Sequence, residues 1–224
     1  TVKERVMAGS QHIVRVDSEN DHELTGLEQR SLVQHIQRLA GDCDVVIFED
    51  YDKGTLNQEV ITQTVTFCKE QGIPTVVDPK RRNFLTYAGV SLFKPNLKEL
   101  SEGLQVELES GNLQQLAAAV RELKQQMPFE QALITLSEHG VFIEDGEQEV
   151  HIPAHVRKIA DVSGAGDTVV SIAALALALK LPLQTIASLA NLGGGLVCEH
   201  LGVVPIDLDQ LMVEAVTESL FSES

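Results

Sequence analysis

The stretch DVSGAGDTVVSIAALALAL, residues 161–179, decides the fold expected for this chain. It joins a small loop, Gly164-Ala165-Gly166, to Asp167 and to a long apolar run with helical spacing. Small residues let backbone N–H groups approach an anion closely, and the helix that follows directs the positive end of its dipole at the same point. The sequence therefore predicts a phosphate-binding loop at the start of a helix.

Asp167 adds a second expectation. A carboxylate repels phosphate, so a loop that only binds phosphate gains nothing from it, whereas a proton acceptor for an attacking hydroxyl belongs at this place. The structural alternative is that the aspartate caps the helix and Gly-Ala-Gly is a tight turn packed against a sheet. Neither the P-loop nor the Rossmann fingerprint fits the sequence.

Short apolar segments alternate with amphipathic ones along most of the chain, which predicts an α/β fold with a mostly parallel sheet and helices on both faces. Ligands of such sheets bind beyond the carboxyl ends of the strands, where Asp50, Asp78, Asn96 and Ser137 are expected to face one crevice. Strands are expected at 44–50, 75–79, 92–96, 132–136, 140–145 and 149–153, and helices at 27–39, 57–71, 112–126, 165–179, 183–199 and 208–220.

The composition narrows the possible functions. A chain of 224 residues that is 43% hydrophobic can bury one sizeable core. Its 17 Lys and Arg residues against 33 Asp and Glu give a net charge of −16, which argues against a nucleic-acid or membrane partner. Cys43, Cys68 and Cys198 lack a Cys-x-x-Cys pair, which favours the reducing cytoplasm. No apolar run is long enough to span a bilayer.

A second motif, KPNLKEL, follows the strand expected at 92–96 and places Asn96 three residues before Glu99 on a starting helix turn. Amide and carboxylate oxygens suit a hydrated Mg²⁺ ion. The alternative is a capping pair, in which Asn96 caps the helix and Glu99 reaches back to it.

The motif DVSGAGDT resembles the C-terminal motif of the ribokinase/phosphofructokinase-B family of sugar kinases. The resemblance implies a three-layer ribokinase-like fold, with the backbone of Gly164, Ala165 and Gly166 as an anion hole and Asp167 as the catalytic base. It also implies ATP as phosphoryl donor. The Asn96 and Glu99 pair resembles the family motif that organises Mg²⁺ and water around the ATP phosphates.

Further residues are assigned to ATP or to cations by the same resemblance. Ser137 and Gly140 in TLSEHG would line the nucleotide site, although relatives usually have glycine at position 137, and a plain hairpin turn is the alternative. Asn191, in the glycine-rich segment ANLGGGLV, would lie near adenine, although close helix packing also explains these glycines. Asp161, with Ser163, resembles a site for a monovalent cation such as K⁺.

Three segments narrow the resemblance to one branch of the family, the heptose 7-phosphate kinases of lipopolysaccharide-core biosynthesis. They are DYDKG (50–54), VDPKRRN (77–83) and the opening TVKERVMAGSQHIVRVD (1–17). This branch implies ATP-dependent phosphorylation of D-glycero-β-D-manno-heptose 7-phosphate at O1. Lys80 would contact the nucleotide, and Lys3, Arg15 and Lys53 would lie on the sugar-phosphate side. Solvated surface charge is an equal alternative for Arg81 and Arg82.

The expected organisation is one kinase domain over residues 1–224. Residues 1–17 form two strands, joined at Gly9-Ser10, on the substrate and lid side, and residues 27–220 form the α/β nucleotide-binding core. Relatives carry an additional N-terminal segment, so we expect an N-terminally incomplete domain. Family analogy adds a homodimer through the lid strands and a nucleotidyltransferase domain after residue 224. The alternatives are another sugar kinase of the family and an inactive nucleotide- or sugar-sensing subunit.

Overall fold

A computed structural model describes residues 2–8, 11–19 and 21–220 of the chain. In this part the main sheet has six strands in the order β3-β4-β5-β6-β7-β8, which is also their order in the sequence. Strands β3 to β6 are parallel, while β7 and β8 run antiparallel to their neighbours. The strands are β3 (Val46–Glu49), β4 (Thr75–Asp78), β5 (Leu92–Phe93), β6 (Gln131–Thr135), β7 (Val141–Glu144) and β8 (Glu149–Ile152).

The helices agree closely with the ranges expected from the sequence. The sequence predicts no more than a starting turn for α3, but this helix continues for two turns, to Leu104. Two short 3-10 turns, η1 (Arg81–Asn83) and η2 (Ser137–His139), had not been expected. The α-helices are α1 (Gly26–Ala40), α2 (Gln58–Gln71), α3 (Leu97–Leu104), α4 (Leu113–Gln126), α5 (Ala165–Ala178), α6 (Leu183–Val197) and α7 (Leu208–Thr217).

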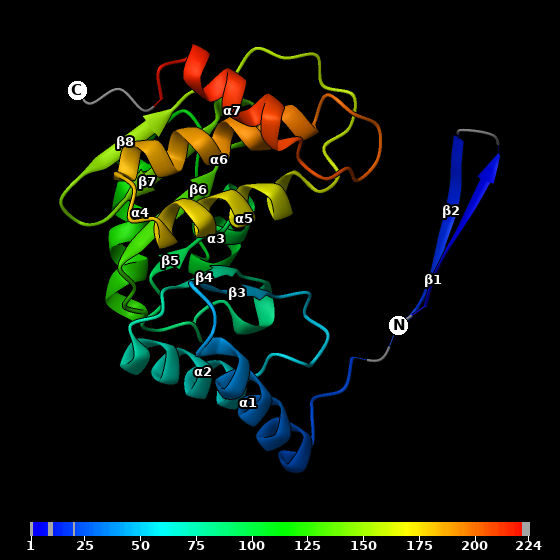
Figure 1. The fold of residues 1–224 in the computed structure, drawn as a ribbon, viewed down its shortest axis with the longest axis vertical. Coiled ribbons are helices and arrows are strands. Elements are labelled where there is room, and N and C mark those ends of the chain that lie inside the picture. The colour runs from blue at the N-terminus through cyan, green and yellow to red at the C-terminus, as the bar shows by residue number, and fades with distance from the viewer. Residues whose placement is uncertain (1, 9–10, 20, 221–224) are drawn as a thin grey trace.

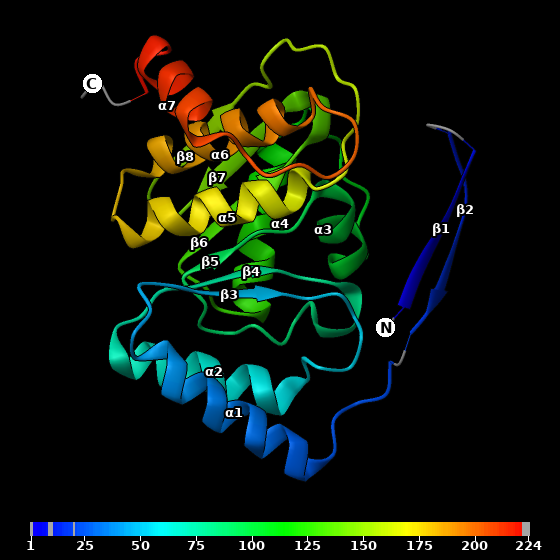
Figure 2. The ribbon, with the colours of Figure 1, turned by 45° about the vertical axis from the view of Figure 1, so that its right-hand side comes forward.

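The molecule has three layers, as expected for a ribokinase-like α/β fold (Figures 1 and 2). Alternate side chains of each strand point to opposite faces of the sheet, so every central strand contributes to two cores. One core packs Phe48, Val77 and Phe93 against α2, α3 and α4. The other packs Val76, Leu92 and residues of β6 and β7 against α5, α6 and α7.

Two glycines of α6 let it approach α5 closely. A Cβ added to Gly193 would lie 2.1 Å from Cδ1 of Ile172, and one added to Gly194 would lie 2.7 Å from Cγ2 of Val169. These distances are shorter than any normal van der Waals contact, so the backbone itself packs against the neighbouring helix. Of the two explanations for the glycine run, close packing is therefore confirmed at these two positions.

Strands β1 (Val2–Ala8) and β2 (Gln11–Ser18) form a separate antiparallel pair, as the alternation of residues 2–16 predicts. Both views show this pair standing apart from the main sheet (Figures 1 and 2). The turn expected at Gly9-Ser10 lies outside the described residues. Among the residues that are described, no helix has the length and apolar character needed to cross a membrane.

Candidate active site

The carboxyl ends of β3 and β4 place two acidic side chains next to each other. Glu49 ends β3 and is paired in parallel register with Asp78, which ends β4. Phe48 and Val77, one position earlier, point into the core under α2, α3 and α4. Because side chains alternate across a strand, Glu49 and Asp78 both point to the opposite face, where α5 lies.

Helix α5 brings Asp167 to the same place. Gly164 precedes the helix with a left-handed φ of 80°, a conformation that favours glycine, and Asp167 lies in the first turn. The N–H groups of a first turn have no acceptor within the helix and can bind an anion, and that of Ala165 also donates to the backbone oxygen of Val162 at 3.3 Å. A Cβ added to Gly166 would meet nothing within 4 Å, so the space beside this turn is open. These features fit the phosphate-binding loop that the sequence predicts.

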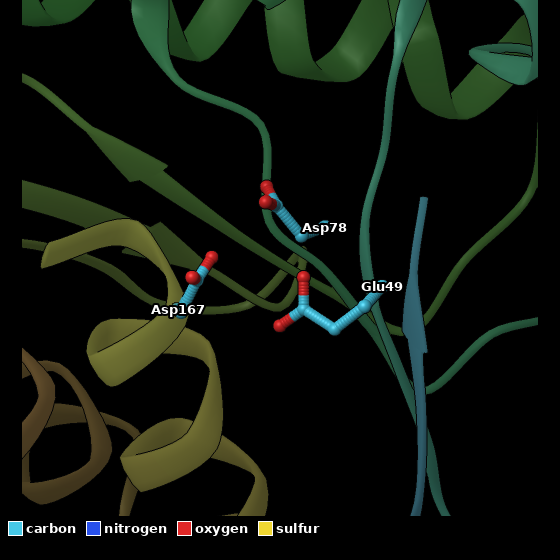
Figure 3. Close-up of side chains that lie close together, drawn as sticks. All are labelled: Glu49, Asp78 and Asp167. Atoms are coloured by element: carbon cyan, nitrogen blue, oxygen red, sulfur yellow. The ribbon is translucent and has the colours of Figure 1, made fainter. Parts of the chain in front are cut away.

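The carboxylates of Glu49, Asp78 and Asp167 converge on one space (Figure 3). One oxygen from each lies within 4.8 Å of those of the other two. Asp78 is buried, Glu49 is half-buried and Asp167 is exposed. Three negative charges at this separation repel one another, so the cluster needs compensating charge or a bound proton.

Two lysines supply compensating charge, and both contact Asp78. Lys94 Nζ lies 2.8 Å from Asp78 Oδ1, and the Lys94 side chain is only 3% exposed. Lys80 Nζ lies 3.4 Å from Asp78 Oδ2 and 2.6 Å from Glu99 Oε1. Burial opposes the charged form of Lys80, but the hydrogen bond to Glu99 and the two nearby carboxylates outweigh it and raise the pKa of Lys80. Lys80 therefore links the acidic cluster to the start of α3.

Glu49 can hold a proton near neutral pH. Burial, followed by the negative charges of Asp78 and Asp167, raises the pKa of Glu49 to about 7. Lys94 and Lys80 act in the opposite direction but do not cancel these effects. A carboxyl group with this pKa exchanges its proton near neutral pH.

Asn96 and Glu99 form the capping box that was the alternative to a magnesium site. The backbone N–H of Asn96 donates to Glu99 Oε2 at 2.9 Å, and that of Glu99 donates to Asn96 Oδ1 at 2.8 Å. A cavity of about 320 Å³ beside them is also lined by Lys80. The donor set fits Mg²⁺ held through water, because amide and carboxylate oxygens can accept further hydrogen bonds from coordinated water. The magnesium assignment stays a prediction.

Asp161 precedes the loop and shapes it. Its Oδ1 accepts hydrogen bonds from the backbone N–H of Ser163 at 3.0 Å and from the Ser163 hydroxyl at 2.8 Å, and its Oδ2 accepts from the N–H of Gly202 at 3.0 Å. The Ser163 and Gly202 hydrogen bonds lower the pKa of Asp161, so the carboxylate is ionised. Asp161 joins the segments before α5 and α7, and its predicted contact with a monovalent cation is untested.

Ser137 and Gly140 occupy the turn between the antiparallel strands β6 and β7, so the hairpin reading of TLSEHG is correct. Both residues have positive φ values, 53° and 85°. A Cβ on Gly140 would lie 2.0 Å from the backbone oxygen of Ile152 and 2.6 Å from the nitrogen of Ala154, so only glycine fits. Ser137 is exposed. Their proposed contact with the nucleotide stays a prediction.

Asn191 is buried in α6, and its side-chain amide donates to the backbone oxygen of Pro153 at 2.9 Å. This hydrogen bond connects α6 to the residue that follows β8. The hydrogen bond gives Asn191 a structural role in joining these two elements. The position of Asn191 near adenine stays a prediction.

The residues expected on the sugar-phosphate side are only partly described. Lys53, in the loop after β3, forms an ion pair with Glu19, which lies between β2 and α1. Lys3 and Arg15 lie on β1 and β2, but their side chains fall outside the described part of the structure. Arg82 Nε lies 3.4 Å from Asp52 Oδ1. The contact of these residues with substrate stays a prediction.

The prediction that Asp50 faces the crevice was wrong. Asp50 has the same parity along the chain as Phe48, so it points into the opposite core and is 2% exposed. Its Oδ2 accepts hydrogen bonds from Asn83 Nδ2 at 2.9 Å and from the Tyr87 hydroxyl at 2.8 Å. Glu49 takes the place expected for Asp50.

Ribokinase-like proteins have a three-layer α/β architecture in which a helix at the carboxyl edge of the sheet carries an aspartate in its first turn. The chain belongs to the pfkB family of carbohydrate kinases, whose profile matches residues 7–210. The resemblance carried by DVSGAGDT is thereby confirmed.

Curated relatives include the bifunctional protein HldE of Syntrophotalea carbinolica, which is 35% identical over 213 residues and aligns with 93% of this chain and 42% of its own length. The bifunctional protein HldE of Mesorhizobium japonicum is 36% identical over 219 residues, with 98% of this chain and 43% of the relative covered. This chain therefore spans less than half the length of these relatives.

Solved structures of other carbohydrate kinases share the fold. Phosphofructokinase-2 from Escherichia coli, solved in complex with potassium, has a TM-score of 0.78 and 21% identity over 88% of this chain and 64% of the other. Arabidopsis thaliana ribokinase, complexed with ribose and ATP, has a TM-score of 0.67 and 16% identity over 92% of this chain and 62% of the other. At these identities the likeness establishes the fold.

Proposed function

We propose that this chain forms the ATP-dependent kinase part of a heptose 7-phosphate kinase. The reaction would phosphorylate O1 of D-glycero-β-D-manno-heptose 7-phosphate and give the 1,7-bisphosphate, a step of ADP-heptose and lipopolysaccharide-core biosynthesis. The observation that carries the proposal is Asp167, placed in the first turn of α5 at the carboxyl edge of the sheet. The relatives named HldE support the heptose substrate.

Asp167 and the backbone of the preceding loop have different roles in the proposed reaction. The carboxylate of Asp167 accepts the proton of the sugar hydroxyl as that oxygen attacks the γ-phosphorus of ATP. The N–H groups of Gly164, Ala165 and Gly166, together with the helix dipole, hold the transferring phosphoryl group. A carboxylate in this position suits a loose transition state in which the proton leaves late.

Cations complete the site. Asn96 and Glu99 would hold Mg²⁺ through water, and Lys80 lies within hydrogen-bonding distance of Glu99. When bound, Mg²⁺ neutralises charge on the β- and γ-phosphates. Asp161 and Ser163 would border a K⁺ site next to the anion hole.

The substrate side and the partners follow from the family. Lys53 would meet the sugar phosphate, and the β1–β2 pair, with Lys3 and Arg15, would cover it and pair with a second copy in a homodimer. The name "bifunctional" among the relatives is consistent with a nucleotidyltransferase domain in the natural protein. The free cysteines fit a reducing, cytoplasmic location.

The test is Mg²⁺-dependent ADP release by the full-length natural protein, with heptose 7-phosphate, fructose 6-phosphate and ribose offered separately. We expect turnover with heptose 7-phosphate alone. Turnover with another sugar would instead identify a different kinase of the family. ATP binding without turnover on any sugar would favour a sensing subunit.

A further inference from the structure

Compensating charge in the acidic cluster is distributed unevenly. Lys94 and Lys80 both pair with Asp78. Among the described residues, neither Glu49 nor Asp167 takes part in an ion pair. The two carboxylates without a cation therefore face each other in the open part of the site (Figure 3).

A proton is the simplest way to relieve this repulsion, and Glu49 is where it binds. The ionised form of Glu49 is disfavoured because the side chain is half-buried and close to Asp78 and Asp167. Asp78, in contrast, has two ammonium groups within 3.4 Å of its carboxylate oxygens. The charged and titratable groups that influence Glu49, or are influenced by it, are Asp78, Asp167, Lys80, Lys94 and Tyr51.

We propose that Glu49 is the proton relay of the transfer site: it takes from Asp167 the proton that Asp167 accepts from the sugar hydroxyl, and releases it to solvent. This inference rests on the proposed kinase function. Glu49 acts through Asp167 and does not need to touch the substrate.

Atoms and charge are conserved in this transfer. The sugar O–H bond breaks as its oxygen bonds to the γ-phosphorus, and the bond from that phosphorus to the β–γ bridging oxygen breaks, with its electron pair leaving on ADP. The proton moves to the carboxylate of Asp167 and then to the carboxylate of Glu49. A separation within 4.8 Å can be bridged by one water molecule.

The relay has a chemical advantage for Asp167. Glu49 has a pKa of about 7, so it can accept a proton and release it again near neutral pH. Asp167 then returns to its ionised form before the next turnover. The relay requires Glu49 to be ionised at the start, so kcat should rise as the pH rises through about 7.

The test is the pH dependence of kcat for the wild type, Glu49→Gln and Glu49→Asp. We expect the wild-type rise in kcat near neutral pH to vanish in Glu49→Gln, with kcat reduced roughly tenfold, KM for ATP unchanged, and partial recovery in Glu49→Asp. Glu49→Gln should cause no further loss in an Asp167→Asn background, because the relay acts through Asp167.

Glu144→Gln is the matched control. Burial also raises the pKa of Glu144, but this residue ends β7 opposite Ala132, at the far end of the sheet. Its substitution should leave the pH profile of kcat unchanged. A wild-type pH profile that persists in Glu49→Gln would overturn the relay while leaving the kinase function intact, whereas absence of wild-type turnover would count against the kinase function.

Discussion

Lys94 and Asp78 form a buried ion pair at the carboxyl edge of the sheet, with 2.8 Å between Nζ and Oδ1. Lys94 follows β5 and Asp78 ends β4, so the pair joins two neighbouring parallel strands. The same carboxylate faces Glu49 and Asp167 in the candidate active site. The pair thus connects the stability of the sheet to the charge of the site.

Replacement of Lys94 by methionine should be strongly destabilising. It leaves the buried Asp78 with only the longer contact to Lys80, at 3.4 Å, and loss of one partner of a buried pair costs about 3 kcal/mol or more. Urea unfolding of Lys94→Met measures this loss. The double variant Asp78→Asn/Lys94→Met should be the more stable of the two, and an equal or larger loss in the double variant would contradict this account of the pair.

Glu49 should make the stability of the fold depend on pH. Its pKa is about 7 in the folded protein against 4.5 for the ordinary group, so the stabilisation is complete below pH 4.5 and is lost as the pH rises through about 7. Wild-type stability should fall by about 1–3 kcal/mol over this interval because of Glu49. In Glu49→Gln this contribution disappears.

The measurement compares urea unfolding of the wild type and Glu49→Gln at about pH 5 and about pH 8. The glutamine variant should gain stability relative to the wild type at the higher pH. A constant difference between the two proteins across this range would show that Glu49 is ionised in the folded protein at both pH values.

Substitution of Gly140 by alanine should damage the β6–β7 hairpin far more than a positive φ alone can explain. The added Cβ would overlap the backbone near Ile152, which cannot move away as a flexible side chain can. We expect a loss of more than about 3 kcal/mol in the free energy of unfolding. Gly72→Ala is the control, because Gly72 also has a positive φ, of 69°, with nothing within 4 Å of its Cβ position.

Gly72→Ala should cost only about 1 kcal/mol, the price of the left-handed backbone. Thermal or urea unfolding of both variants gives the comparison. Similar losses for the two substitutions would mean that the hairpin can shift to accommodate the new methyl group.

Most of the fold could be predicted from the sequence because its local signals agree with one another. The Asn57 side chain caps α2 by accepting a hydrogen bond from the backbone N–H of Val60, and Gly72 ends the same helix in a left-handed conformation. The residue types predict both features. The apolar run of β3, by contrast, has no clear alternation. It could not show by itself that Glu49, and not Asp50, faces the site.

Lys94 was missed for a different reason. Lysine is rarely buried unless it is paired, and its partner Asp78 belongs to another strand, so only the assembled sheet brings the two together. Asp167 could be identified because it lies in the local motif DVSGAGDT. Asn96 and Glu99 could be identified because they are three residues apart at the start of a helix. The approach of Asp167 to Glu49 and Asp78 is a property of the tertiary structure.

The central claim is that Asp167 accepts the proton during phosphoryl transfer. The most direct test is the rate of Mg²⁺-dependent ADP release with heptose 7-phosphate for the wild type and Asp167→Asn, together with ATP affinity measured by calorimetry. We predict that Asp167→Asn loses about two to four decades of turnover while it still binds ATP, as is usual when a general base is removed. Near-normal turnover in Asp167→Asn would contradict the assignment.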